Sequence, residues 1–319
     1  MVFEITITKD YEGVSPKGYI KKMVDVPFTK VHKLIKEKRL TINGKKIKGE
    51  VKLKTGDVLK CWLDDIKLRN ENQTVSMTEN QESKNLGMDT IFEDENMLIL
   101  NKQAGVVVQG AQDNDTSLSL HLQYLKNKKK DLKEFNYFHV HRLDKDTSGV
   151  LVCAKNQIAL RELNKVFAER QITKKYLCLC DGQFEKQEGT IQVNMDRNEQ
   201  GMKEKMFVSK EGGKKSISHY KVIDEYEFKD ETVTMVEVEI KTGLTHQIRV
   251  HMKSIGHPII SDKMYGNNYI NKVFENSLSR QFLHAQSLEF EYNGVEHKFV
   301  APLTNDLKSL CNKLKIIKY

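Results

Sequence analysis

The sequence has no stretch approaching the ~20 consecutive apolar residues that a bilayer-spanning helix requires. Its first thirteen residues alternate apolar and polar side chains, whereas a secretory signal would carry a continuous apolar core. The 319 residues are 39% hydrophobic and 30% charged, which is typical of a globular protein of about two domains. We therefore expect a cytoplasmic protein without a membrane-inserted segment.

Cysteine is scarce, and the spacing of the cysteines matches no metal-binding or redox motif. There are five cysteines, an odd number, and none form the C-x-x-C pairs of a zinc knuckle or a thioredoxin-like site. The pattern predicts reduced, mostly buried thiols.

Basic residues, in contrast, are concentrated near the N-terminus. Residues 17–60 contain thirteen Lys and Arg39 against four acidic residues, a local net charge of +10, while the whole chain carries +8. Within this segment, apolar residues recur at helical spacing from Phe28 to Ile35, and Asn43-Gly44 predicts a hairpin between two short strands. The segment is either a solvated lysine-rich face or a compact surface that binds phosphate groups.

The stretch from Val31 to Val58 resembles the alpha-L RNA-binding domain found in many RNA-modifying enzymes. The resemblance implies a small α+β RNA-binding domain over residues 1–65. Residues 66–88 lose periodicity and predict a flexible linker, and residues 89–319 predict one larger domain. The basic residues expected to contact RNA in the first domain are Lys33, Lys36, Lys38, Arg39 and Lys45.

The second domain contains a dense cluster of reactive residue types. Residues 138–149, FHVHRLDKDTSG, place two His, one Arg, two Asp, one Thr and one Ser directly before the apolar strand 150–154. Asp144, Asp146 and Ser148 fit the opening of a calcium loop, but Lys155 stands where that loop requires Glu. His139 and His141 share a strand face but lack further metal ligands. A carboxylate at Asp144 performing nucleophilic or acid/base chemistry beside an arginine is the remaining functional interpretation; the alternative is that Asp144 merely caps a turn.

Two later segments add candidates. Residues 174–182 alternate as a strand carrying Tyr176, which is either a core residue or a platform for stacking a base. Residues 246–254 form a short helix with apolar residues on one side and with His246, Arg249 and Lys253 near one another on the other.

Taken together, these segments resemble the RluA-type pseudouridine synthases. The resemblance covers residues 89–305, and with the N-terminal unit it favours the large-subunit ribosomal RNA members, the RluC branch. The matching motifs are His141–Asp144 with Thr147–Gly149, Lys175-Tyr176, Thr242-Gly243 with Thr245–His251, Gly256–Ile259 before Asp262, Tyr265-Gly266 and Leu283–Ala285.

The resemblance implies an α+β fold: a mixed, largely antiparallel sheet with a central RNA-binding cleft. It implies isomerisation of specific uridines in RNA, most plainly 23S rRNA or a large-subunit precursor, to pseudouridine by a monomeric enzyme without metal or cofactor. Asp144 is then the catalytic aspartate, Arg249 its cationic partner and Tyr176 the residue that packs on the target base. Residues expected to contact RNA are Arg142, which would occupy the space left by the flipped base, and His141, Thr147, His246 and Gln247.

Three positions depart from the family pattern. Leu244 stands where arginine is common, Gln103 where proline is usual, and Ser261 where glycine often precedes Asp262. Other interpretations of the chain are a non-catalytic ribosome-assembly factor on the same fold, a synthase acting on tRNA, and a metal-dependent RNA hydrolase.

Overall fold

The computed structural model describes residues 2–23, 31, 34–37, 39–47, 51–62, 83–108, 116–128, 137–169, 171–197 and 205–317. The chain divides into two compact units, one built mainly from residues 1–83 and the other from most of residues 84–319. The predicted linker falls largely outside the described residues. In the described part of the chain, no helix is long and apolar enough to cross a membrane.

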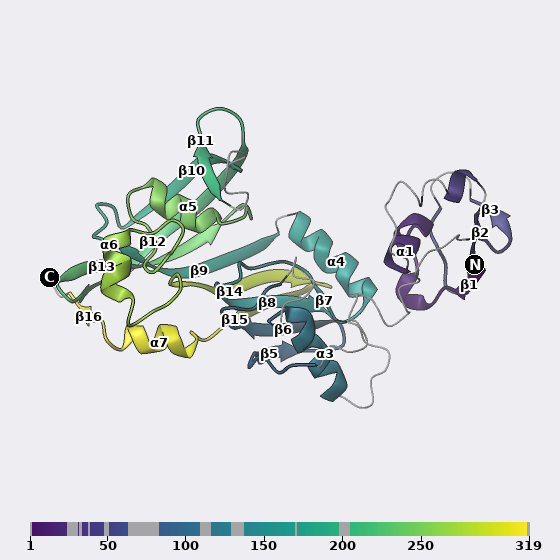
Figure 1. Cartoon of the computed structure of the whole chain (residues 1–319), viewed down its shortest axis with the longest axis horizontal. Coiled ribbons are helices and arrows are strands. Elements are labelled where there is room, and N and C mark those ends of the chain that lie inside the picture. Colours follow the sequence, from purple (N-terminus) through teal and green to yellow (C-terminus); the bar gives the residue numbers. More distant parts are fainter. Residues whose placement is uncertain are drawn as a thin grey trace. The chain divides into compact units, whose positions relative to one another are not determined.

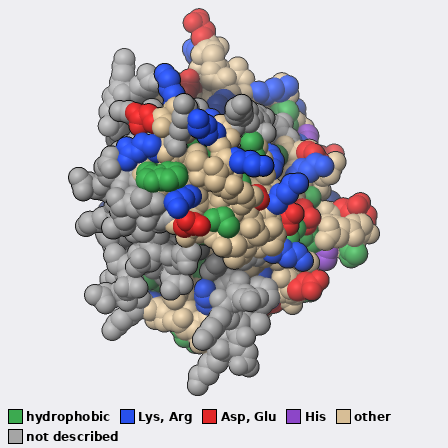
Figure 2. Space-filling model, turned by 90° about the vertical axis from the view of Figure 1, so that its right-hand side faces the viewer, with side chains coloured by type: hydrophobic (Ala, Val, Ile, Leu, Met, Phe, Trp, Pro, Cys, Tyr) green, Lys and Arg blue, Asp and Glu red, His purple; other side chains and the backbone are tan. Residues whose placement is uncertain are grey.

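The first unit is a four-stranded sheet with strand order β1-β4-β2-β3. Its elements are β1 (Val2–Thr6), a 3-10 helix η1 (Lys9–Tyr11), α1 (Pro16–Met23), β2 (Leu40–Ile42), β3 (Lys45–Lys46) and β4 (Val58–Trp62). The predicted hairpin at Asn43-Gly44 is confirmed, since both residues adopt the positive φ values, 50° and 74°, that a tight turn of this kind needs. Figure 2 shows Lys and Arg side chains exposed among acidic ones on one face of the molecule.

The second unit is built on a twelve-stranded sheet, and Figure 1 shows its long strands running through this part of the molecule. Its main order is β11-β10-β12-β13-β9-β14-β8-β6-β5, with β15, β16 and β7 added beside β14, β12 and β8. The strands are β5 (Asp89–Glu93), β6 (Met97–Lys102), β7 (Phe138–His139), β8 (Ser148–Ala154), β9 (Ile172–Asp181), β10 (Glu188–Arg197), β11 (Met206–Ser209), β12 (Lys214–Phe228), β13 (Glu231–Ile240), β14 (Leu283–Tyr292), β15 (Val295–Val300) and β16 (Lys315–Ile316).

Every pairing between these strands is antiparallel except that of β8 with β14. The helices are α3 (Leu118–Lys128), α4 (Gln157–Ala168), α5 (Gln247–Ser254), α6 (Asn268–Phe274) and α7 (Asn305–Cys311). The predicted α+β class with a mixed, largely antiparallel sheet is therefore confirmed.

The centre of this sheet is buried on both faces. Along β8, Leu151 packs into the same cluster as Leu118 and Leu122 of α3, whereas Val152 packs into the cluster that contains Leu163 of α4. Alternate residues of one strand thus face opposite cores, which requires the continuous apolar run seen in the sequence.

Gly149 of the reactive-residue motif has a structural role where β8 meets β14. Its φ is +116°, and a Cβ at this position would lie 2.1 Å from the carbonyl oxygen of Ala285. Only glycine permits this close approach, which brings the loop containing Asp144 against β14.

Candidate active site

Asp144 lies on the loop between β7 and β8, and a buried lysine holds that loop in place. Lys102, at the end of β6, is fully buried, and its Nζ donates hydrogen bonds to the carbonyl oxygens of Lys145 and Thr147, both at 2.8 Å, and of Gln103 at 3.0 Å. An ammonium group has three donors, so this arrangement uses all of them. Burial lowers the pKa of Lys102 to about 7, and nearby acidic side chains oppose the decrease.

A second buried cation holds the same loop from the other side. Arg280 donates from Nη1 to the carbonyl oxygen of Asp146 at 3.1 Å and from Nη2 to the hydroxyl of Ser148 at 3.2 Å. Its Nε donates to Asp306 at 2.7 Å, which provides a counter-charge. The backbone after Asp144 is thus fixed at successive carbonyl groups by side chains that are distant in sequence.

Arg249 of α5 is held by a buried carboxylate. Its Nε and Nη2 donate to the two oxygens of Asp262 at 2.6 and 2.8 Å, and Asp262 also accepts the backbone N–H groups of Met264 and Tyr265 at 2.9 and 3.0 Å. Burial opposes the charged form of both groups, but this pairing outweighs it: the pKa of Arg249 is raised and that of Asp262 is lowered. Both side chains remain charged and rigidly oriented.

Asp144 faces this pair. Its Oδ2 lies 3.6 Å from Nη1 of Arg249, the nitrogen that Asp262 does not use, and 3.9 Å from Nε2 of His246. The hydroxyl oxygen of Tyr265 accepts the backbone N–H of Met206 at 2.8 Å and lies 3.0 Å from Nδ1 of His246. The contact between Nδ1 and the Tyr265 hydroxyl orients the imidazole of His246 so that its Nε2 is directed toward Asp144.

The segment that carries His246 is shaped for this position. His246 precedes the first turn of α5 with φ of 56°, a left-handed conformation that residues other than glycine adopt at a cost. The Gln247 amide oxygen accepts from the Thr242 hydroxyl at 2.7 Å and from the Leu244 N–H at 3.1 Å, and its amide nitrogen donates to two groups of β12. These four hydrogen bonds fix the 242–247 loop against the sheet.

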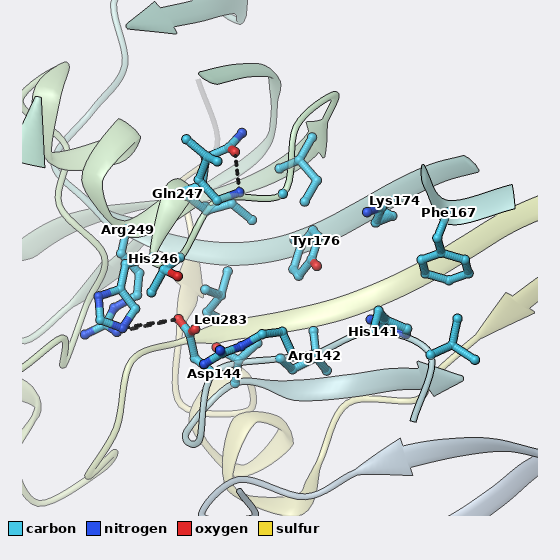
Figure 3. Close-up of a pocket in the computed structure, with 18 of the residues that line it drawn as sticks. His141, Arg142, Asp144, Phe167, Lys174, Tyr176, His246, Gln247, Arg249 and Leu283 are labelled. Atoms are coloured by element: carbon cyan, nitrogen blue, oxygen red, sulfur yellow. Dashed lines mark hydrogen bonds and ion pairs between the residues drawn. The ribbon is translucent and has the colours of Figure 1, made fainter. Parts of the chain in front are cut away.

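A pocket of about 350 Å³ opens over these groups. Figure 3 shows Asp144, His246 and Arg249 together at one end of it, with Tyr176 of β9 beside them along the cavity. Tyr176 is largely buried, and burial, with the charge of Asp144, raises its pKa, so its phenol stays neutral. Such a cavity, mostly apolar with a few convergent charged groups, is typical of a ligand site.

All eight residues predicted for the second domain's site line this one pocket. They are Arg142, which is exposed, and His141, Asp144, Thr147, Tyr176, His246, Gln247 and Arg249. The structure thus brings together residues drawn from three separate sequence motifs.

The predicted residues of the first unit belong to a separate body. Lys36 and Lys45 are exposed and Arg39 is partly exposed, while Lys33 and Lys38 lie outside the described residues. The predicted binding surface is therefore described at three of its five positions.

Sequence reasoning gave no role to three buried charged residues that organise the site, Lys102, Arg280 and Asp262. Lys102 ends an apolar strand, and Asp262 follows the turn at Gly256 and Pro258. A charged residue next to segments expected to be buried is unusual, and this was the signal that could have indicated a role.

Comparison with known proteins identifies the chain. Residues 96–254 match the family model described as RNA pseudouridylate synthase. The chain is 32% identical over 315 residues to ribosomal large subunit pseudouridine synthase C of Haemophilus influenzae, covering 98% of this chain and 94% of that protein. It is 33% identical over 298 residues to the protein of the same name from Buchnera aphidicola, covering 92% and 91%.

Solved structures agree. Human RNA pseudouridylate synthase domain containing 1 aligns over 76% of this chain and 92% of its own, with 26% identity and a TM-score of 0.61. Human RNA pseudouridylate synthase domain containing 4 shares the fold, with 22% identity and a TM-score of 0.58. The fold and the matches define an RNA-modifying isomerase. The chain belongs to the RluA-type RNA pseudouridylate synthase family, and it converts uridine in RNA to pseudouridine.

Proposed function

We propose that the RNA substrate is large-subunit ribosomal RNA or its precursor, modified in the cytoplasm by a monomeric enzyme. The observation that carries this proposal is the similarity to proteins named ribosomal large subunit pseudouridine synthase C over 94% of the length of one of them. The match includes the basic N-terminal segment as well as the catalytic unit, since it spans 98% of this chain.

Asp144 is the catalytic carboxylate in this proposal. The reaction breaks the C1′–N1 glycosidic bond, rotates the uracil and rejoins it through C5, so it needs an ionised group at the reacting sugar or base. Nη1 of Arg249 lies 3.6 Å from Oδ2 of Asp144, so the guanidinium places a positive charge directly beside this carboxylate. His246, at 3.9 Å, adds a donor on the same side.

The target uridine must leave its stack to reach Asp144, because C1′ and the uracil face are inaccessible within a helix. Tyr176 packs against the extruded base, and the exposed Arg142 at the pocket rim occupies the space that the base leaves. The same pocket wall includes His141 and Thr147, which contact the RNA in this proposal. Gln247 contributes indirectly: its amide is already hydrogen-bonded within the protein, and it holds the 242–247 loop in position.

Residues 1–65 form the RNA-binding domain in this proposal, residues 66–88 the linker and residues 89–319 the catalytic domain. Lys36, Lys45 and Arg39, with Lys33 and Lys38, contact phosphates. Replacing Lys36 and Lys45 by Gln in the full chain then weakens rRNA binding and lowers the slope of log K against log salt by about 1 to 2. An unchanged affinity and slope would leave this surface without a role in binding.

The substrate is tested by incubating the purified protein with unmodified large-subunit rRNA and, separately, with unmodified tRNA, followed by chemical mapping of pseudouridine. Site-specific product in the rRNA alone supports the proposal. Product in tRNA alone would contradict the substrate while leaving the isomerase activity intact.

A further inference from the structure

The pocket extends well beyond the groups that surround Asp144. Figure 3 shows Tyr176 midway along it, and at the far end Lys174 from β9, Phe167 from α4 and His141 from the loop after β7. The residues proposed to carry the reaction, Asp144, Arg249 and Tyr176, lie at the other end and midway along the pocket. The far end therefore needs an explanation of its own.

The strand β9 presents two residues to this cavity. Side chains two apart on a strand face the same way and are spaced by about 7 Å, so Lys174 and Tyr176 both line the pocket. Lys175, between them, faces the other side and forms an ion pair with Glu237 at 2.9 Å. The ammonium group of Lys174 thus belongs to the residue two positions before Tyr176, the tyrosine proposed to pack on the base, on the same face of β9.

Phe167 gives this end a flat aromatic surface. Its ring stacks on His141 with centroids 5.0 Å apart and planes 22° from parallel, and Nζ of Lys174 lies 5.6 Å from the Phe167 ring centre. His141 is fixed behind it, because Nε2 accepts the backbone N–H of Val152 at 3.0 Å. Burial, with the charge of Lys174, lowers the pKa of His141 to about 3, so the ring stays neutral and can stack.

Aromatic rings beside cations are the elements with which proteins hold single-stranded nucleic acid: a base stacks on the ring, and the cation meets the phosphate. A strand whose target base occupies the Tyr176 end would continue toward the Lys174 end, because the same cavity connects the two.

We propose that Phe167 and Lys174 form a subsite for the nucleotide that flanks the target uridine. The face of Phe167 that His141 does not cover stacks on the base of this nucleotide, and Lys174 contacts its phosphate. The subsite rests on the proposed function of the adjacent site. It makes recognition depend on two neighbouring nucleotides, not on the uridine alone.

The test compares substrates and variants of the full chain in steady-state pseudouridine formation. Phe167→Leu leaves an apolar side chain beside Phe290, whose ring centre lies 6.1 Å from that of Phe167, but removes the aromatic face. We expect its KM to rise about tenfold or more, with kcat changed less than about twofold. Phe167→Tyr restores the face and should restore KM.

The base itself is removed in the second arm. An RNA fragment carrying the mapped target uridine is made with an abasic nucleotide on its 5′ side or on its 3′ side. One of the two should raise KM for the unmutated protein as much as Phe167→Leu does, and the variant should lose nothing further on it. Equal losses for Phe167→Leu on the intact fragment and on both abasic fragments would show that Phe167 only packs, and would overturn the subsite.

Lys174→Gln is compared with Lys175→Gln, its neighbour on the opposite face. Lys174→Gln should weaken RNA binding and lower the slope of log K against log salt by about 1, as expected for the loss of one phosphate contact. Lys175→Gln should change neither the affinity nor the slope. If the unmutated protein forms no pseudouridine in rRNA, the proposed substrate fails. Binding of these variants to a single-stranded uridine-containing oligoribonucleotide then still decides the subsite: equal affinities for all of them would contradict it.

Discussion

Arg249 donates two parallel hydrogen bonds of 2.6 and 2.8 Å from Nε and Nη2 to Asp262, and this leaves Nη1 of the guanidinium to face Asp144. Asp262 has a fully buried side chain, so water cannot replace it as a partner. The position of the cation beside Asp144, the proposed catalytic carboxylate, is thus set by a second carboxylate that does not line the pocket.

Asp262→Asn should therefore damage both stability and catalysis. Removing one partner of a buried ion pair costs about 3–5 kcal/mol of the free energy of unfolding, and Arg249 is then free to turn toward Asp144. Urea unfolding and kcat, measured well below the melting temperature, check the two effects. A variant with normal stability and normal kcat would contradict the positioning role of Asp262.

Lys102→Met should lower kcat more than it raises KM, because the loop that carries Asp144 loses its anchor while the pocket wall remains. The carbonyl groups of Gln103 and Thr147 lose the Lys102 donor, whereas that of Lys145 keeps the Gly105 N–H at 2.9 Å, so the free energy of unfolding should also fall by about 2 kcal/mol. Lys145→Met is the matched control, since Lys145 is exposed on the same loop and contributes only its carbonyl to the network. Similar losses in both variants would show that charge, and not the anchor, matters.

Stability should fall in mild acid. Burial lowers the pKa of His284 from 6.5 to about 4, and its ring nitrogens are used by Ser148 and the Ala301 carbonyl. Between these values the unfolded chain binds a proton that the folded chain does not, so the free energy of unfolding decreases as the pH falls from 6.5 to about 4.

The effect is measured by urea unfolding at about pH 7.5 and about pH 5, where one such histidine contributes a difference of about 2 kcal/mol. His284→Gln should shrink the difference by that amount. His219→Gln, at a partly exposed position on β12, is the comparison variant. A His284→Gln protein with the full difference would contradict the assignment.

Ser261→Gly should stabilise the fold. Ser261 adopts φ of 60°, a left-handed conformation that favours glycine, and its buried hydroxyl has no hydrogen-bond partner among the described residues. Relief of both costs outweighs the greater flexibility of glycine in the unfolded chain and should add about 1 kcal/mol. A lower melting temperature for Ser261→Gly than for the unmutated chain would show that this conformation is not strained.

Much of the fold and the site could be predicted because the signals were local. The hairpin at Asn43-Gly44, the apolar strand after Asp144 and the helix carrying Arg249 each follow from short-range periodicity or turn chemistry. The predicted site residues converge on one pocket because their motifs end strands of one sheet or flank them.

The supporting charges could not be predicted in the same way. Lys102 meets the carbonyl of Lys145 across 43 residues of sequence, and Arg280 meets the Ser148 hydroxyl across 132. No periodicity encodes such pairings. The first follows from the antiparallel pairing of β6 with β8, which sets Lys102 opposite Gly149. The second accompanies the parallel contact of β8 with β14, which depends on the absence of a side chain at Gly149. Likewise, Phe167 at the far end of the pocket stacks on His141, which lies 26 residues earlier in the sequence.

The most direct test of the whole account is chemical mapping of pseudouridine in large-subunit rRNA after incubation with the unmutated protein, Asp144→Asn and Asp146→Asn. Asp146 is the matched control, because it is a partly buried carboxylate on the same loop that does not line the pocket. We predict site-specific product with the unmutated and Asp146→Asn proteins and none with a folded, RNA-binding Asp144→Asn protein. Product formed by Asp144→Asn at an undiminished rate would contradict the central claim that Asp144 carries the reaction.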